Sequence, residues 1–126
     1  MRKILLAALA ATTIGSALAA ELPVTSQAEI EGLLSTLGSS DCQFYRNGSW
    51  HNGGEAESHL RMKYEALRRR GSLHSTEEFI EGAATKSSLS GESYAVKCSN
   101  EPAQPSAAWL GAKLKVLRAP PAGRKS

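Results

Sequence analysis

The sequence predicts an α+β fold, in which about four helices pack on a small antiparallel sheet made of a β-hairpin and one later strand. Two observations carry this prediction. The stretch from Cys42 to Trp50 holds three of the seven aromatic residues around an Asn47-Gly48 pair. Asn-Gly favours a hairpin because a type I′ turn needs positive φ at both central positions. Elsewhere, apolar residues recur at helical spacing, so we expect helices to pack around the hairpin.

The first helix is predicted over residues 26–37. Its apolar side chains repeat at helical spacing and are Ile30, Leu33, Leu34 and Leu37. Ser26 and Glu29 have the spacing of a capping box, in which each side chain accepts a bond from a free backbone N–H of the first turn. Gly38 is expected to end the helix.

A second helix is predicted over residues 55–70, and Gly71 is expected to stop it. Its buried stripe is Ala56, Leu60, Tyr64 and Leu67. Its exposed side carries two oppositely charged pairs at i,i+4 spacing, Glu57 with Arg61 and Glu65 with Arg69. Each such pair stabilises a helix by a few tenths of a kcal/mol.

Three further elements are expected. A third helix begins near Ser75, which has the capping-box spacing to Glu78. Its inner face is Phe79, Ile80, Ala83 and Ala84. Alternation over residues 94–98 predicts a strand. Residues 99–104 are expected to be loop, and a last helix starts at Pro105-Ser106 and ends before Pro120.

The N-terminus has the features of a secretory signal peptide. Arg2 and Lys3 precede an apolar stretch over residues 4–14, and Ala17-Leu18-Ala19 supplies a cleavage site. We expect cleavage after Ala19, with Ala20 as the alternative. The apolar stretch is shorter than the roughly 20 residues of a spanning helix, so no membrane span is expected after cleavage.

Export places the protein in the periplasm, or alternatively in the medium as a secreted protein. The expected organisation is a signal peptide over residues 1–19, a single small α+β domain over 20–118 and a disordered C-terminal tail over 119–126. Removing 19 of the 126 residues leaves 107, which is enough for one modest hydrophobic core.

The charge distribution weighs against nucleic acid as a partner. The chain has 15 Lys or Arg residues against 12 Asp or Glu, and loss of Arg2 and Lys3 leaves a net charge of +1. Five of the remaining cations lie near the C-terminus: Lys113, Lys115, Arg118, Arg124 and Lys125. Without them the mature body carries a net charge of −4, whereas nucleic-acid binding needs a basic face.

An exported chain meets an oxidising compartment, so Cys42 and Cys98 are expected to form a disulfide. The chain has 2 cysteines, so only one pairing exists. In the chain-entropy picture, closing a loop of this size stabilises the fold by roughly 4 kcal/mol. The spacing matches neither a CxxC redox site nor a zinc knuckle. We expect no metal and no cofactor.

Several short stretches resemble the YfeK-like family of small exported bacterial proteins. They are Arg46-Asn47-Gly48, Glu55-Ala56, Ser58-His59-Leu60-Arg61 with Lys63, Thr76-Glu77, Phe79-Ile80 with Ala83, Ser87-Ser88, Ser90-Gly91, and Tyr94 with Val96-Lys97. The resemblance runs from about Ile30 to Leu114. It implies a small exported domain with no assigned biochemical activity, so it gives no catalytic residue to carry over.

The candidate binding residues at the hairpin are Arg46, Asn47 and Trp50. An exposed Trp with Arg and Asn donors beside it suits a sugar ring or an extended peptide. In the alternative, Asn47-Gly48 serves only the turn, and Phe44 and Trp50 fill the core.

The candidate residues on the second helix are His59 and Lys63, which lie one turn apart. A histidine beside a lysine has its charge suppressed and can act as a base. In the alternative, both side chains simply cover the margin of the core.

These patterns favour a non-catalytic binding or accessory module of the bacterial cell envelope. The expected partner is an envelope component or another protein, and no residue is assigned a catalytic role. One alternative is a small envelope hydrolase, with His59 as base and Lys63 or a serine of residues 87–90 assisting. Another is a structural or stress protein without a ligand.

Overall fold

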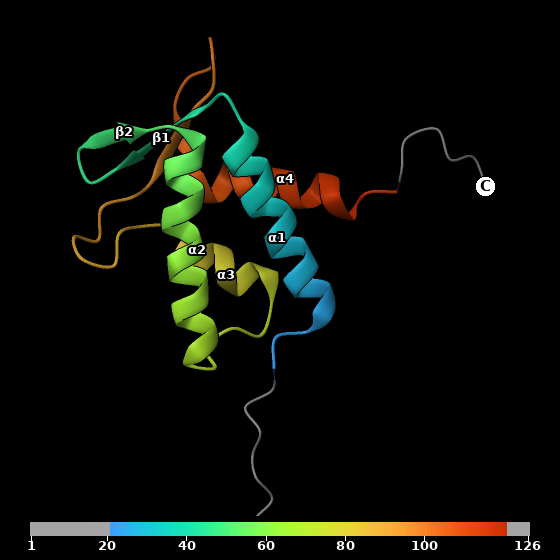
Figure 1. Cartoon of the computed structure of the whole chain (residues 1–126). Coiled ribbons are helices and arrows are strands. Elements are labelled where there is room, and N and C mark those ends of the chain that lie inside the picture. Colours follow the sequence, from blue (N-terminus) through green and yellow to red (C-terminus); the bar gives the residue numbers. More distant parts are fainter. Residues whose placement is uncertain (1–20, 121–126) are drawn as a thin grey trace, which may run out of the picture.

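The computed structural model describes residues 21–120, and the predicted hairpin lies within a four-stranded antiparallel sheet (Figure 1). Strand β1 (Gln43–Arg46) pairs with β2 (Ser49–His51). Asn47 and Gly48 both have positive φ, 47° and 87°, as an Asn-Gly turn requires. Strand β3 (Ala95–Lys97) lies on the other side of β1, and the strand order is β2-β1-β3-β4.

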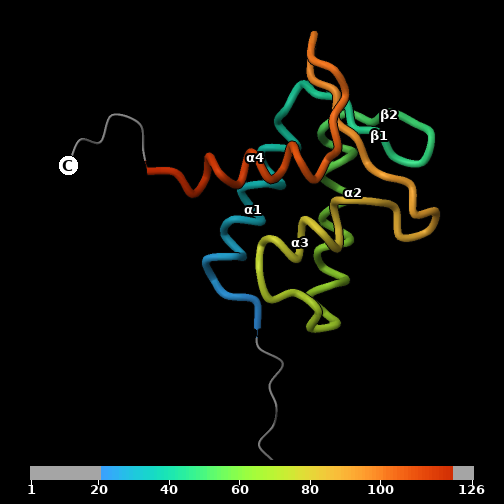
Figure 2. The backbone as a smooth tube through the Cα atoms, turned by 180° about the vertical axis from the view of Figure 1, so that it is seen from behind, coloured from blue at the N-terminus to red at the C-terminus, as the bar shows by residue number. Residues whose placement is uncertain are grey.

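Four helices complete the α+β fold. They are α1 (Val24–Ser39), α2 (Gly53–Arg69), α3 (Thr76–Ala83) and α4 (Ser106–Arg118). Helices α1 and α2 lie alongside one another, and α4 crosses α1 near its C-terminal end (Figure 1). Seen from behind, α3 and α4 cover the other side of the α1–α2 pair (Figure 2). The fold class predicted from the sequence is confirmed.

The core forms where the predicted apolar stripes meet. All four apolar residues of the first predicted stripe are buried, and Phe79 of α3 and Val96 of β3 pack in the same cluster. Helix α4 adds Trp109, Leu110 and Leu114. The ring of Phe44 meets that of Trp109 edge to face at 5.5 Å between centroids, which is a favoured aromatic geometry. This contact joins the hairpin to α4.

The first helix begins and ends differently from the prediction. It starts at Val24 after Pro23, whose side chain makes no capping bond, and it continues through Gly38 to Ser39. The fixed φ of proline suits a helix start. The capping box predicted for Ser26 and Glu29 is therefore wrong. The helix begins two residues before Ser26, so Ser26 does not occupy the N-cap position.

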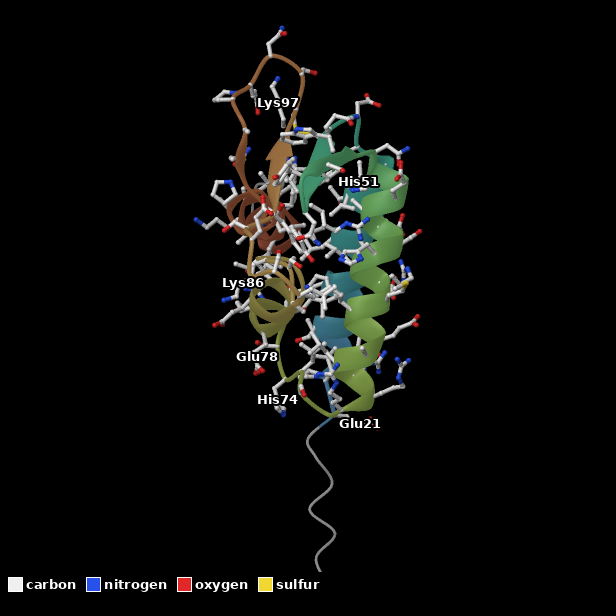
Figure 3. All side chains as sticks on the ribbon, turned by 90° about the vertical axis from the view of Figure 1, so that its left-hand side faces the viewer. Glu21, His51, His74, Glu78, Lys86 and Lys97 are labelled. Atoms are coloured by element: carbon white, nitrogen blue, oxygen red, sulfur yellow. A yellow bond between two sulfur atoms is a disulfide. The ribbon has the colours of Figure 1, made fainter. Side chains whose placement is uncertain are left out.

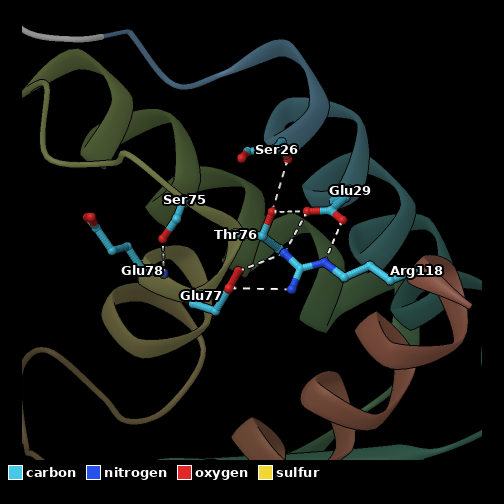
Figure 4. A network of polar contacts seen from close by, with 7 residues as sticks. All are labelled: Ser26, Glu29, Ser75, Thr76, Glu77, Glu78 and Arg118. Carbon is cyan, nitrogen blue, oxygen red and sulfur yellow. Dashed lines mark hydrogen bonds and ion pairs between the residues drawn. The ribbon is translucent and has the colours of Figure 1, made fainter.

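The Glu29 carboxylate instead joins three helices (Figure 4). It accepts a hydrogen bond from the buried Thr76 hydroxyl at 2.6 Å and bonds from Arg118 Nε and an Arg118 terminal nitrogen at 2.7 and 3.0 Å. The same guanidinium bonds Glu77 at 2.8 Å. These contacts lower the pKa of Glu29 from 4.5 to about 2, first through Arg118 and then through Thr76. The network ties α1 and α3 to the last residue of α4.

Two other predicted contacts have different outcomes. Ser75 caps α3 by accepting a bond from the Glu78 backbone N–H at 3.1 Å, as expected. On α2, Glu57 and Arg61 pair at 3.0 Å, whereas Glu65 and Arg69 do not form an ion pair in the described part of the chain. Both of those side chains are exposed, where the entropy of holding two long side chains together offsets the attraction.

Two element boundaries also depart from the prediction. Asn52 caps α2 by accepting a bond from the Glu55 backbone N–H at 2.9 Å, so this helix begins at Gly53 rather than at residue 55. The expected loop over residues 99–104 ends in a short strand, β4 (Gln104–Pro105), which pairs with β3. A proline is tolerated there because β4 is the edge of the sheet.

Cys42 and Cys98 form the predicted disulfide. Gln43 pairs with Lys97 across β1 and β3, so the two cysteines face each other one position further along. The bond closes the end of the β1–β3 ladder. The predicted signal peptide (residues 1–19) and residues 121–126 of the predicted tail lie outside the described residues. No helix within residues 21–120 is long and apolar enough to cross a membrane.

Candidate functional site

The predicted site residues of the hairpin lie on two different faces of it. Tyr45 pairs with Trp50, and Arg46 pairs with Ser49. Directly paired residues point to the same face, and successive residues alternate between faces. Tyr45 and Trp50 therefore share the outer face, whereas Arg46 lies on the inner face with Phe44. The predicted group of Arg46, Asn47 and Trp50 is thus divided.

The outer face carries an exposed aromatic pair. The Trp50 side chain is 45% exposed and meets the Tyr45 ring edge to face at 5.4 Å between centroids. The Tyr45 hydroxyl donates to the Glu92 carboxylate, and this bond raises the pKa of Tyr45. Trp50 does not fill the core, so that part of the structural alternative is wrong. The Trp50 ring is available at the surface and packs against the Tyr45 ring.

The tip of the hairpin is tied to a neighbouring loop. The Ser90 hydroxyl donates to Asn47 Oδ1 at 2.7 Å. In the same loop, Ser87 is buried and its oxygen accepts bonds from the backbone N–H groups of Leu89 and Ser90, both at 3.2 Å. These serine side chains stabilise a turn and hold the hairpin tip against it.

The inner face of the hairpin covers a small cavity of about 30 Å³. Its floor is apolar and is formed by Leu37, Phe44, Leu60, Val96, Trp109 and Leu110. The polar or partly polar residues that also line it are Tyr45, Arg46 and His51 of the hairpin, His59 of α2, Tyr94 just before β3 and the buried Ser106 of α4. The cavity therefore combines an apolar floor with a polar rim that includes one arginine.

His59 and Lys63 are brought together by Tyr94. Lys63 Nζ donates to the Tyr94 hydroxyl at 3.2 Å and to the Lys86 carbonyl at 3.1 Å. The Tyr94 oxygen lies 3.1 Å from His59 Nε2. Because lysine can only donate, the single hydroxyl proton of Tyr94 is free to bond His59, which places an unprotonated Nε2 at this contact. The three side chains satisfy one another.

Burial sets the protonation of this group. It lowers the pKa of His59 from 6.5 to about 4, with the positive charges of Arg46 and Lys63 adding to the effect. Burial also lowers the pKa of Lys63 and raises that of Tyr94. His59 is thus neutral at pH 7, and its low basicity makes it a poor general base there.

Arg46 differs from its polar neighbours because its side chain has no hydrogen-bonding or ion-pair partner among residues 21–120. Within residues 21–120 its guanidinium makes no ion pair. Nearby, His51 Nδ1 lies 3.1 Å from a Glu55 carboxylate oxygen. Arg46 lowers the pKa of Glu55 from a distance, but that carboxylate is engaged by His51.

Sequence reasoning missed Tyr94 and the His51–Glu55 pair as members of this region. His51 and Glu55 are four residues apart, but His51 belongs to the hairpin and Glu55 to the first turn of α2. The pair could have been suggested only if the start of α2 at Gly53 had been known. Histidines do not converge on a metal site: His51 lies by the hairpin and His74 at the opposite end of the molecule (Figure 3). His74 instead approaches Glu78 at 3.1 Å.

The fold and these contacts define a small disulfide-bonded α+β domain with an exposed aromatic pair and a small cationic cavity. Residues 24–118 match the family described as "Family of unknown function (DUF5329)", and the chain belongs to this family. It is 41% identical over 69 residues to "Uncharacterized protein YfeK" of Salmonella typhimurium. That match covers 54% of this chain and 56% of the relative, so the chain spans about half the length of the curated relative. No solved structure matches.

Proposed function

We propose that this protein is a non-catalytic binding or accessory module of the cell envelope, exported to the periplasm, which contacts an envelope component or a protein partner through its hairpin. The observation that carries the proposal is the outer hairpin face. Trp50 is exposed there and rests on Tyr45, which Glu92 holds in place. A large rigid side chain fixed at the surface loses little conformational entropy on binding, so it suits a recognition surface.

The state of the His59 group supports binding over hydrolysis. Lys63 donates to two acceptors, and His59 Nε2 faces Tyr94. Of the three serines in the 87–90 loop, Ser87 accepts two backbone bonds within a turn and Ser90 donates to Asn47, whereas Ser88 is exposed. Within the described residues His59 Nε2 bonds Tyr94 and none of these serines. The adjoining cavity of about 30 Å³ is also too small for a sugar ring. A hydrolase with His59 as base would need all of these contacts rearranged.

The test is binding of periplasmic components to the mature chain and to Trp50→Ala. The control is Met62→Ala, because Met62 is another exposed apolar side chain, 66% exposed on α2. Ligands recovered by crosslinking are then titrated as purified components, with isothermal titration calorimetry as readout. We expect Trp50→Ala to lose binding and Met62→Ala to retain it, with similar melting temperatures for all three proteins. Equal retention by both variants would refute a role for the outer face.

Localisation is tested separately by cell fractionation. The proposal expects the processed chain, beginning at Ala20 or at Glu21, in the periplasmic fraction. An unprocessed chain retained in the cytoplasm would contradict it. Turnover of cell-wall fragments by the mature protein, abolished in His59→Gln, would favour the hydrolase alternative instead.

A further inference from the structure

Arg46 lies at the rim of the inner cavity, and its side chain makes no hydrogen bond within the part of the chain that the structure describes. Its guanidinium has five N–H donors in a planar fork that matches a carboxylate. Within the described residues no carboxylate comes within ion-pair distance of it, and the carboxylate of Glu55 is engaged by His51. The ammonium group of Lys63 and the imidazole of His59 are both already bonded to the Tyr94 hydroxyl. The rim can therefore accept one negative charge, at Arg46.

The cavity below Arg46 sets the size of what can accompany that charge. Its volume is about 30 Å³, on a scale where one water needs about 10–15 Å³. This is room for a methyl or ethyl group and not for a ring. Its floor is apolar, built from side chains such as Leu60, Val96 and Leu110, so an alkyl group is favoured there over a second polar group. His59, neutral at pH 7, adds no competing charge.

We propose that this cavity binds a chain-terminal carboxylate whose residue carries a methyl-sized side chain, such as the C-terminal alanine of a peptide. Arg46 pairs with the carboxylate, and the methyl group enters the apolar floor between α2 and β3. Inorganic phosphate would satisfy Arg46 but would leave the floor empty. The inference rests on the hairpin being the binding element of the proposed function, yet it concerns the opposite face from Trp50.

The experiment titrates the mature chain with acetyl-Ala-Ala and follows the methyl NMR signals of Val96 and Leu60. Three further probes are acetyl-Ala-alaninamide, acetyl-Ala-Phe and inorganic phosphate. We expect acetyl-Ala-Ala to shift both methyl signals. The amide and the Phe peptide should bind at least about tenfold more weakly, which is about 1.4 kcal/mol, and phosphate should not shift the floor methyls.

Variants separate the two parts of the site. Arg46→Gln should weaken acetyl-Ala-Ala at least about tenfold, and Arg46→Lys should restore only part of the affinity because lysine cannot pair bidentately. Ala56→Val, at a residue lining the cavity, should block binding while Arg46 is intact. Arg69→Gln is the charge-matched control, since Arg69 is exposed at the far end of α2, and should bind normally.

Several outcomes would overturn the proposal. One is equal binding of acetyl-Ala-Ala and its amide, and another is unchanged affinity for acetyl-Ala-Ala in Arg46→Gln. A third is that phosphate shifts the same methyl signals at the same affinity, because this would indicate an adventitious anion site only. A retained methyl spectrum in each variant shows that loss of binding is not loss of folding. Trp50 does not line this cavity, although its neighbour Tyr45 does. We therefore expect Trp50→Ala to bind acetyl-Ala-Ala normally, so that failure here and failure of the outer-face proposal are distinguishable.

Discussion

Gly53 should be the least replaceable glycine among those at the start of α2. It is buried where the first turn of α2 meets the end of α1. A Cβ added at Gly53 would lie 2.5 Å from the Leu37 carbonyl oxygen and 3.0 Å from those of Gly38 and Ser40. All three are backbone atoms, so none can rotate away. Relief requires α1 and α2 to separate by about 1 Å, and overpacking of this kind costs roughly 1–3 kcal/mol.

The net magnitude follows from two opposing effects of Gly53→Ala. Alanine at an unstrained helical position stabilises by about 0.5–1 kcal/mol, and this gain offsets part of the overlap. Subtracting this gain from the middle of the overpacking range, about 2 kcal/mol, leaves an expected net loss of about 1–1.5 kcal/mol. For a domain of this size, that lowers the melting temperature by roughly 4–12 °C.

The assay is thermal and urea unfolding of the mature, disulfide-bonded chain. Gly54→Ala is the matched control, because its Cβ would meet only the Asn52 Oδ1 atom, at an ordinary 3.5 Å. This control should be neutral or stabilised by up to about 1 kcal/mol. If Gly53→Ala and Gly54→Ala have the same stability within about 0.5 kcal/mol, the close approach of the two helices is not real.

Three other predictions concern acid, redox and titration behaviour. The folded pKa of Glu29, about 2, lies below its ordinary 4.5, so its contribution is present above pH 4.5 and lost as pH falls toward 2. Glu29→Gln should lower the free energy of unfolding by about 1–2 kcal/mol at pH 7, allowing for solvent screening, and by little at pH 2. Urea unfolding at both pH values measures this, and equal losses at the two would contradict it. His59 should titrate by NMR near pH 4, so stability also declines between pH 6.5 and 4, and a midpoint above 6 would contradict its burial. Replacing both Cys42 and Cys98 by serine should cost roughly 4 kcal/mol, and full thiol labelling of the untreated native protein would refute the disulfide.

Local signals predicted the elements of this fold well. The Asn47-Gly48 turn, the apolar stripe of α1 and the Ser75 cap each depend on residues within a few positions, and all three are present. The pairing of the disulfide was predictable because a chain with two cysteines allows only one pairing. Short-range physical rules are sufficient for features of this kind.

Features that depend on distant residues were not predictable in the same way. Glu29 has a capping-box partner in Ser26 by spacing, yet it bonds Arg118, which is 89 residues away in the sequence. Tyr94 joins His59 and Lys63 across 35 and 31 positions. Strand alternation alone places Phe44 and Arg46 on one face of the hairpin. Grouping Trp50 with Arg46 overlooked the register, because a two-residue Asn47-Gly48 turn pairs Arg46 with Ser49 and Tyr45 with Trp50.

The position of Arg118 has a consequence for the order in which the protein can be completed. The residue that closes the network of α1 and α3 is the last one of α4, and α4 also supplies Trp109, Leu110 and Leu114 to the core. During synthesis these residues are made after every other element of the domain. An emerging chain can form the α1–α2 pair early, but the core remains open until α4 arrives. A chain terminated before Ser106 is therefore expected to be an aggregation-prone intermediate with exposed apolar surface, rather than a smaller version of the fold.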